Sequence, residues 1–314
     1  MKLSLVVPCY NEAENVAAFQ QAVIQAFDGC GYDYEIVYVN DGSKDNTLQE
    51  LRKLFSQQLC PVKVVSFSRN FGKESGIYAG IKQASGDYVS LIDADLQQRP
   101  EIVREMVTTL DEQPQYDIVA AYQDRRNEGK VLSFFKKAFY KLINKLASVE
   151  LRPDASDFRT FRRVVAESIV SLGEYHRFSK GIFAWVGFNT CYIPYVACQR
   201  AAGTTKWNFR KLFNYALDGI IGYSTTPLRG ATFLGTLTAF AALIYLIIVI
   251  VQKLTTGIDV PGYATIIVLI LFLGSMQLFC IGIIGEYVGR TFEQSKNRPI
   301  YLSSEILSYE EDDA

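Results

Sequence analysis

The stretch LIDADLQ, residues 91–97, joins an apolar run to two carboxylates that lie two positions apart. The run from Tyr88 to Ile92 has the composition of a buried β-strand. Residues two apart in an extended segment point to the same side, so Asp93 and Asp95 are expected to face together. Two carboxylates and an amide at a strand end suit a hard divalent cation that also binds phosphate oxygens. An isolated Asp-x-Asp is more often a strand end followed by a polar turn, so the rest of the chain decides between these interpretations.

Short apolar runs alternate with longer segments of helical spacing through the first 122 residues. The expected strands are 3–7, 34–40, 62–68, 87–92 and 117–122, and the expected helices are 12–28, 45–58, 73–84 and 100–112. This alternation predicts an α/β fold, a mostly parallel sheet with helices on both faces.

Polar residues follow the first four expected strands. They are residues 8–12, 40–43, 68–70 and 93–95. Ligands bind at the carboxyl ends of the strands in such sheets, so four polar strand ends on one edge predict a binding site. We expect the Asp41 carboxylate to accept an N–H group of a nucleotide base. Because His176 is the only histidine, most kinds of zinc catalysis are unlikely on composition.

The 314-residue chain is 49% apolar, but its apolar residues are unevenly distributed. No charged residue lies between Arg229 and Lys253 or between Asp259 and Glu286. Each run supplies the ~20 apolar residues that cross a bilayer. We therefore expect a globular domain over 1–228, a hairpin of two transmembrane helices within 229–290, and an acidic tail over 291–314. The spans are expected at about 231–252 and 263–287, and basic flanking residues place both termini in the cytosol.

Two amphipathic helices are expected beside the spans, at about 130–148 and 207–222. In the first, apolar residues recur every three or four positions, and four lysines lie within 136–145. Basic amphipathic helices next to spans are typical of an anionic membrane surface rather than of nucleic acid. An ordinary surface helix packed on the core is the alternative.

The region between the two amphipathic helices is harder to interpret. Asp157 could cap the amino end of a helix running through 160–172. Residues 178–186 and 190–196 have the composition of a further pair of strands. Arg200 and Lys206 flank a glycine, as in a phosphate-binding loop.

Together, the strand-end motifs resemble those of a known family. The motifs are VVPCYNE (6–12), VNDGS (39–43), RNFGK (69–73) and DADLQ (93–97). They are similar to the successive motifs of family 2 inverting glycosyltransferases, which have the Rossmann-like GT-A fold. More narrowly they resemble the polyprenyl-phosphate glycosyltransferases, a group that includes dolichyl-phosphate mannose synthase and the bacterial undecaprenyl-phosphate (bactoprenol) glucosyltransferases. The resemblance extends to about residue 300. One departure is QRPE (98–101), where relatives often read DPPE.

The resemblance implies transfer of a sugar from a nucleotide sugar to undecaprenyl or another polyprenyl phosphate. Glucose from UDP-glucose is the first choice, and the lipid-linked product would serve cell-envelope glycan modification. The reaction would take place at the cytosolic face of the bacterial cytoplasmic (inner) membrane. Glycines within the spans also predict close helix packing in a homo-oligomer, for example a tetramer.

The same resemblance implies roles for individual residues. Those expected to line the donor nucleotide are Pro8, Tyr10, Glu12, Asp41 and Asp93. Asp93 would face the ribose and sugar, and Asp95 with Gln97 would hold Mg²⁺ or Mn²⁺ on the diphosphate. Asp157 completes the catalytic group with Asp93 and Asp95, and we expect it to orient the acceptor rather than act as a base. The cations expected to screen the acceptor phosphate are Arg125, Arg126, Arg200 and Lys206.

Three alternatives stay open on the sequence. The sugar could be N-acetylglucosamine, mannose or an aminoarabinose type. A processive polysaccharide synthase usually carries Gln-x-x-Arg-Trp and more spans, and residues 199–203 read QRAAG. A non-catalytic membrane scaffold would not need intact Asp41, Asp93, Asp95 and Gln97.

Overall fold

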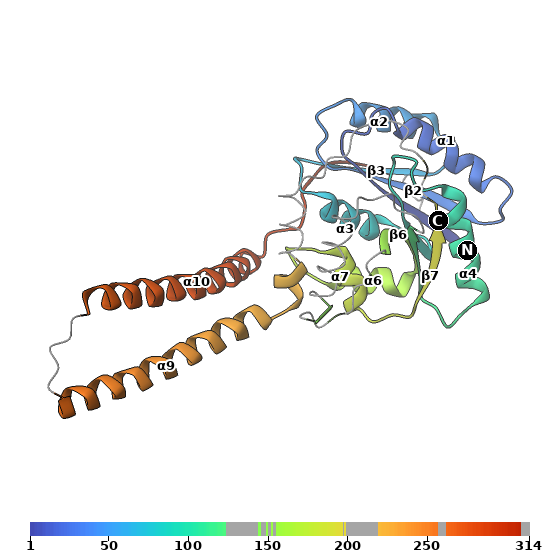
Figure 1. Cartoon of the computed structure of the whole chain (residues 1–314). Coiled ribbons are helices and arrows are strands. Elements are labelled where there is room, and N and C mark those ends of the chain that lie inside the picture. Colours follow the sequence, from blue (N-terminus) through green and yellow to red (C-terminus); the bar gives the residue numbers. More distant parts are fainter. Residues whose placement is uncertain are drawn as a thin grey trace.

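The computed structural model describes residues 1–123, 155–196, 219–256 and 262–308, together with 144, 145, 149, 152 and 198. It consists of an α/β body from which two long helices extend next to each other (Figure 1). Most of the expected amphipathic helix 130–148 lies outside the described residues, as do residues 207–218 of the second one and the acidic residues 310–313. Residues 219–223 are helical.

The described residues form one eight-stranded mixed sheet in the order β7-β5-β6-β4-β1-β2-β3-β8. Its strands are β1 (Lys2–Cys9), β2 (Asp33–Asn40), β3 (Val62–Phe67), β4 (Tyr88–Leu91), β5 (Ile118–Gln123), β6 (Ala155–Arg162), β7 (Thr190–Tyr195) and β8 (Ser303–Leu307). Strands β1, β2, β3 and β4 pair in parallel, whereas β6 is antiparallel to both β4 and β5. The carboxyl ends of four strands therefore meet at one edge, as the sequence predicts.

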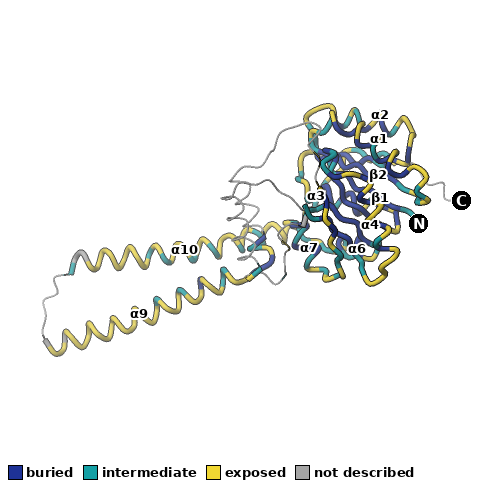
Figure 2. Tube along the Cα trace, turned by 45° about the vertical axis from the view of Figure 1, so that its right-hand side comes forward, coloured by how far each residue is buried: buried dark blue, intermediate teal, exposed yellow. Residues whose placement is uncertain are grey.

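Helices cover both faces of the sheet (Figure 2). One face packs against α1 (Val16–Phe27), α2 (Thr47–Gln57) and α4 (Pro100–Glu112), and the other against α3 (Lys73–Gln83), α6 (Arg163–Ser171) and α7 (Ser179–Trp185). The alternation of apolar residues in β1 explains the two layers, because Leu5 and Val6 point to opposite faces. Helix α3 lies very close to the sheet: a Cβ at Gly80 would come within 2.2 Å of Val6 Cγ1.

The expected helix cap at Asp157 is wrong, because Asp157 lies within strand β6 and the helix that follows begins only at Arg163. β6 inserts between β4 and β5, where Phe158, Thr160 and Phe161 are fully buried. Burial on both faces removes the alternation that identifies a half-exposed strand from sequence. The strand expected over 178–186 is also wrong: α7 occupies this segment, whereas the strand expected over 190–196 is confirmed as β7.

The segment after the second long helix returns to the sheet, which the expected acidic tail over 291–314 did not anticipate. β8 pairs antiparallel with β3 and covers its edge. The Glu305 carboxylate forms an ion pair with Arg52 at 2.6 Å. Next to the strand, Tyr301 stacks on Phe67 with 4.8 Å between ring centroids. β8 therefore replaces β3 as the edge strand of the sheet.

The two long helices are α9 (Thr226–Thr256) and α10 (Tyr263–Ser295). Each contains a segment long and apolar enough to cross a membrane, with a hydropathy of 2.6, and the side chains of that segment are not buried in the protein. Lipid is the solvent that suits such exposed apolar helices. The amino end of α9 and the carboxyl end of α10 both join the α/β body (Figure 1). Near the end of α10, Arg290 Nε lies 3.5 Å from Glu286 Oε1.

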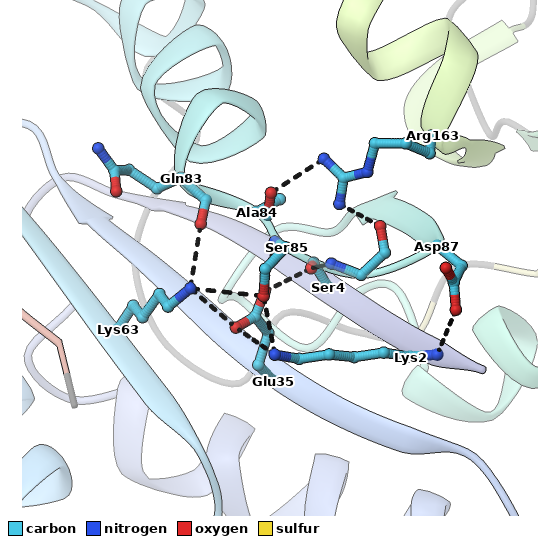
Figure 3. Close-up of polar contacts among 10 residues, drawn as sticks. Lys2, Ser4, Glu35, Lys63, Gln83, Ala84, Ser85, Asp87 and Arg163 are labelled. Atoms are coloured by element: carbon cyan, nitrogen blue, oxygen red, sulfur yellow. Dashed lines mark hydrogen bonds and ion pairs between the residues drawn. The ribbon is translucent and has the colours of Figure 1, made fainter. Parts of the chain in front are cut away.

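The amino ends of the strands carry a closed polar network around Glu35 (Figure 3). Glu35 is 2% exposed and accepts hydrogen bonds from Ser4 Oγ at 2.6 Å, Ser85 N at 2.7 Å and Ser85 Oγ at 2.8 Å. Lys63 and Lys2 lie 3.2 and 3.4 Å from its second oxygen. Although burial alone raises the pKa of Glu35, these hydrogen bonds and Lys63 lower it to about 2. The carboxylate is therefore charged and neutralised within the fold.

Candidate active site

The acidic residues of the candidate site meet because of the register between β4 and β6. Leu91 pairs with Arg159 in this antiparallel ladder. Continuing the register by two residues sets Asp93 opposite Asp157. A narrow cleft at this point is lined by both aspartates and by Pro8. Two residues that the sequence placed in the catalytic group therefore share one cleft.

Lys73 links the two carboxylates. It is the first residue of α3, and its Nζ lies 2.7 and 3.0 Å from the oxygens of Asp93 and 3.7 Å from Asp157 Oδ2. Although burial alone lowers the pKa of Lys73, the two aspartates raise it well above its ordinary value, so the ammonium stays charged. Sequence reasoning quoted Lys73 in a motif but gave it no role. Its position at the start of an expected helix that follows a strand end is the sequence feature that could have indicated a role in the site.

Asp157 keeps its charge in this environment. Burial alone raises the pKa of Asp157, but Lys73, Lys180 and Arg159 outweigh this effect and lower it. Its Oδ1 atom is buried and has no hydrogen-bond partner among the described residues. An anionic oxygen without a donor is a strong acceptor, so this atom is available to orient a hydroxyl group or a bound water.

Glu74, the next residue of α3, behaves in the opposite way. Its Oε2 accepts hydrogen bonds from the Ser179 backbone N–H at 2.8 Å and from the Ser179 hydroxyl. Burial and the nearby Asp157 carboxylate nevertheless raise the pKa of Glu74 to about 7. Nothing in the sequence identified this residue, because its environment comes from three separate segments.

Asp41 organises the loop that leads into α3. Its carboxylate is 3% exposed and accepts hydrogen bonds from Asn70 Nδ2 at 2.9 Å, Phe71 N at 2.6 Å and Gly72 N at 3.0 Å. Burial raises the pKa of Asp41, and the two backbone N–H groups limit the increase. A Cβ at Gly42, whose φ is +59°, would come within 2.3 Å of the backbone at Arg69, so this approach requires glycine. The expected contact of Asp41 with a nucleobase stays a prediction.

Asp95 and Gln97 form a tight turn after β4. Asp95 is 8% exposed, its Oδ1 accepts the Gln97 backbone N–H at 3.1 Å, and Leu96 between them has a φ of +59°. Within the described ranges, no three His, Cys, Asp or Glu side chains form a group that could hold a metal ion. Mg²⁺ and similar cations are commonly held by one or two carboxylates together with substrate phosphates. The donors present fit a cation shared with a diphosphate, not one enclosed by the protein alone.

Of the other residues predicted from the sequence, Glu12 and Tyr10 are described by the structure and four cations are not. Glu12 accepts a hydrogen bond from Asn15 Nδ2 at 2.6 Å, and its backbone N–H donates to Thr47 Oγ1 at 2.9 Å. Tyr10 follows β1 directly and is half-buried. The four cations predicted to screen the acceptor phosphate, Arg125, Arg126, Arg200 and Lys206, lie outside the described residues.

Comparison with known proteins yields two family matches and full-length relatives. The model described as "Glycosyl transferase family 2" matches residues 4–170, and that described as "GtrB C-terminal hairpin" matches residues 226–291. The bactoprenol glucosyl transferase of Shigella phage SfV is 41% identical over 303 residues, which cover 96% of this chain and 98% of that protein. The putative glycosyltransferase CsbB of Bacillus subtilis (strain 168) is 42% identical over 303 residues, 96% of this chain and 91% of that protein. Among solved structures, mannosyl-3-phosphoglycerate synthase from Rubrobacter xylanophilus aligns with a TM-score of 0.49 at 18% identity, over 69% of this chain and 71% of that one.

Proposed function

The chain belongs to glycosyl transferase family 2, and on that premise we propose that it transfers glucose from UDP-glucose to undecaprenyl phosphate or another polyprenyl phosphate. The observation that carries the proposal is the similarity along 96% of the chain to proteins named bactoprenol glucosyl transferases. It is supported by the Rossmann-like GT-A fold, which brings the acidic cleft and two membrane-length helices into one chain.

The donor would bind along the carboxyl edge of the sheet. Pro8, Tyr10 and Glu12 follow β1 and Asp41 follows β2, so all four are proposed to line the nucleotide. Asp93 would face the ribose and sugar, where its oxygens can accept hydroxyl hydrogen bonds. A divalent cation, Mg²⁺ or Mn²⁺, held by Asp95 and Gln97 would stabilise the charge that develops on the departing diphosphate.

The nucleophile would be the acceptor phosphate itself. A phosphate monoester has a second pKa of about 6, so at neutral pH it is largely ionised and needs little help from a base. The charged Asp157 would orient the acceptor, with Lys73 fixing its position relative to Asp93. Attack on the face opposite the leaving group would invert the configuration at the sugar carbon. Arg125, Arg126, Arg200 and Lys206 are proposed to reduce the repulsion between the two anionic substrates.

The membrane arrangement follows from the hairpin. The amino end of α9 and the carboxyl end of α10 adjoin the α/β body, so both ends of the hairpin lie on the same side as the body. The basic residues that flank the spans favour the cytosolic side, against an anionic membrane surface, for the body and both termini. Close packing of the spans in a homo-oligomer, for example a tetramer, belongs to the same proposal.

Purified protein incubated with undecaprenyl phosphate, Mg²⁺ or Mn²⁺ and a panel of nucleotide sugars tests the proposed function. We expect a single lipid-linked glucose with UDP-glucose and no product after chelation of the metal. A product with another sugar would overturn the choice of glucose. A polymer would indicate a processive synthase, and the absence of any product and of any metal-dependent nucleotide binding would indicate a non-catalytic protein.

A further inference from the structure

A second cavity, of about 370 Å³, lies where α10 meets the α/β body. Three segments that are far apart in the sequence line it: residues 69–75 leading into α3, residues 175–178 before α7, and Arg290 with Ile300 in and after α10. Its volume is within the range of ordinary ligand pockets. Arg290 lies about 8 Å from the end of α10 at the usual helical rise, so this cavity adjoins the membrane-facing end of the body.

Arginines dominate the charge of this cavity. Arg69, Arg177 and Arg290 line it from the three segments, and among the described lining residues the one carboxylate is Glu74. Because the pKa of Glu74 is raised to about 7, this side chain carries only part of a negative charge at neutral pH. Several cations in a concave site raise the local concentration of anions.

Arg177 and Arg290 are held in place by other residues of the protein. Arg177 donates hydrogen bonds to the carbonyl oxygens of Leu172 at 2.7 Å and Ile169 at 3.2 Å, and burial lowers its pKa. Its guanidinium lies 4.5 Å from the centre of the Tyr78 ring. The side chain of Arg290 is 17% exposed and pairs with Glu286. Bonds of this kind orient cations before a ligand arrives, which reduces the entropy lost on binding.

The cavity shares a lining residue with the cleft between Asp93 and Asp157. Lys73 lines both, with Asp93 and Asp157 on the cleft side. The walls also include Phe71, Phe178 and Ile300, which give the cavity an apolar part beside its arginines. An anionic headgroup attached to a hydrocarbon chain matches this combination.

We infer that this cavity binds the phosphate of the lipid acceptor, with Arg69, Arg177 and Arg290 as its cationic ligands and the first carbons of the chain against Phe71 and Ile300. The inference rests on the proposed function and adds the location of the acceptor. The acceptor would then reach the Asp93–Asp157 cleft past Lys73, whose ammonium faces the incoming phosphate. A phospholipid headgroup offers the same phosphate chemistry, so the experiment has to separate the two sources.

Arg69→Gln and Arg290→Gln test the inference in the full-length protein in nanodiscs. Each change removes charge-assisted hydrogen bonds to the phosphate and is expected to raise the KM for undecaprenyl phosphate roughly 10-fold or more. The KM for UDP-glucose is expected to stay unchanged. Arg298→Gln is the matched control, because Arg298 is an exposed arginine on the segment after α10 and does not line the cavity. An equal effect of Arg298→Gln would show general attraction to the membrane and overturn the inference, as would an effect confined to the KM for UDP-glucose.

Two further arms complete the test. Binding of farnesyl phosphate without a sugar donor is expected to weaken in Arg69→Gln and Arg290→Gln but not in Arg298→Gln. Phosphatidylglycerol that competes with farnesyl phosphate as strongly as undecaprenyl phosphate does would identify a phospholipid site and overturn the inference. If the wild-type protein makes no lipid-linked sugar, the proposed function fails, whereas the binding arm still decides whether the cavity takes a lipid phosphate.

Discussion

At the amino ends of β1 and β2 the buried Glu35 accepts three hydrogen bonds, whereas at the carboxyl edge of the same sheet Asp157 has a buried oxygen with no partner among the described residues. The pKa values of two glutamates, one at each end of the sheet, also differ. The pKa of Glu35 is lowered to about 2, and that of Glu74 is raised to about 7. Glu35 is buried and Glu74 is half-buried, and the chain provides more donors and cations around Glu35 than around Glu74.

This contrast separates stability from function within one sheet. The Glu35 network is complete without a ligand, and Figure 3 shows its donors converging from β1, β3 and the turn before β4. At the carboxyl edge, Asp157 Oδ1 has no partner among the described residues, and a bound molecule could supply one. Buried polar groups of this kind with shifted pKa values are typical of functional sites. Substitutions at the two ends are therefore expected to affect different measurements.

Asp95→Asn is expected to have the largest effect. Loss of the carboxylate removes the proposed metal ligand and is expected to lower turnover by roughly 100-fold or more, as with loss of other groups that stabilise developing charge. Asparagine keeps an oxygen for the Gln97 N–H, so the thermal unfolding midpoint is expected to change little. Product formation and circular dichroism of the same preparation measure both quantities.

Asp87→Asn is the matched control at the amino end, where Asp87 accepts the Lys2 backbone N–H at 2.9 Å. It is expected to leave turnover unchanged. Near-normal activity of Asp95→Asn would refute the metal assignment.

Glu35→Gln tests the amino end and is expected to lower the free energy of unfolding. A pKa shift from 4.5 to about 2 corresponds to about 3 kcal/mol, which the neutral amide loses. Because the folded-state pKa is the lower one, this contribution is present above about pH 4.5 and is lost as the pH falls towards 2. Urea titrations followed by circular dichroism, at pH 7 and at pH 3, measure the loss and its decrease in acid.

The control for Glu35→Gln is Glu50→Gln. Glu50 pairs with Lys53 on the surface, and such pairs contribute about 0–1 kcal/mol. An equal loss in both variants would mean that the Glu35 network does not stabilise the fold specifically. A large loss of turnover in folded Glu35→Gln would contradict the separation between the two ends.

The sequence predicted the parts of the fold that local patterns determine. Strands β1–β4 and helices α1–α4 follow from alternating apolar runs, and the DADLQ turn at 93–97 lies at the expected edge. The two membrane-length helices follow from the charge-free runs. These features depend on residues close together in the chain, so composition and periodicity are sufficient.

Features that depend on distant partners were missed. β6 is a strand because β4 and β5 leave a place between them, and β8 because the β3 edge is open. The Lys73 bridge between Asp93 and Asp157 joins α3, the end of β4 and β6, and no local pattern encodes that meeting. The cavity lined by Arg69, Arg177 and Arg290 is likewise formed by three segments that are far apart in the sequence.

Glu74→Gln is expected to have a smaller effect of the opposite sign at the carboxyl edge. The folded-state pKa of Glu74 is above the unfolded value, so ionisation destabilises the fold as the pH rises from about 4.5 towards 7. The variant removes this cost. Because Glu74 is only half-buried, water screens part of it, and the gain is expected to be about 1–2 kcal/mol at pH 8, with no gain at pH 4. Thermal unfolding at both pH values measures the difference. The same gain at pH 4 would show that ionisation of Glu74 is not the cause.

Ser4→Ala is expected to have an effect no larger than that of Glu74→Gln, and it tests whether the amino-end network acts as a unit. Ser4 is fully buried, donates to Glu35 and accepts the Gly86 N–H at 2.8 Å, so its loss is expected to cost about 1–2 kcal/mol. Ser56→Ala, which removes a surface hydroxyl, is the control and is expected to stay within about 0.5 kcal/mol. In the Glu35→Gln background the cost of Ser4→Ala is expected to shrink, because a hydrogen bond to a charged oxygen is about twice as strong as one to a neutral oxygen. Equal costs in both backgrounds would mean that Ser4 stabilises the fold through Gly86, and that the charge on Glu35 depends on Ser85 and the lysines.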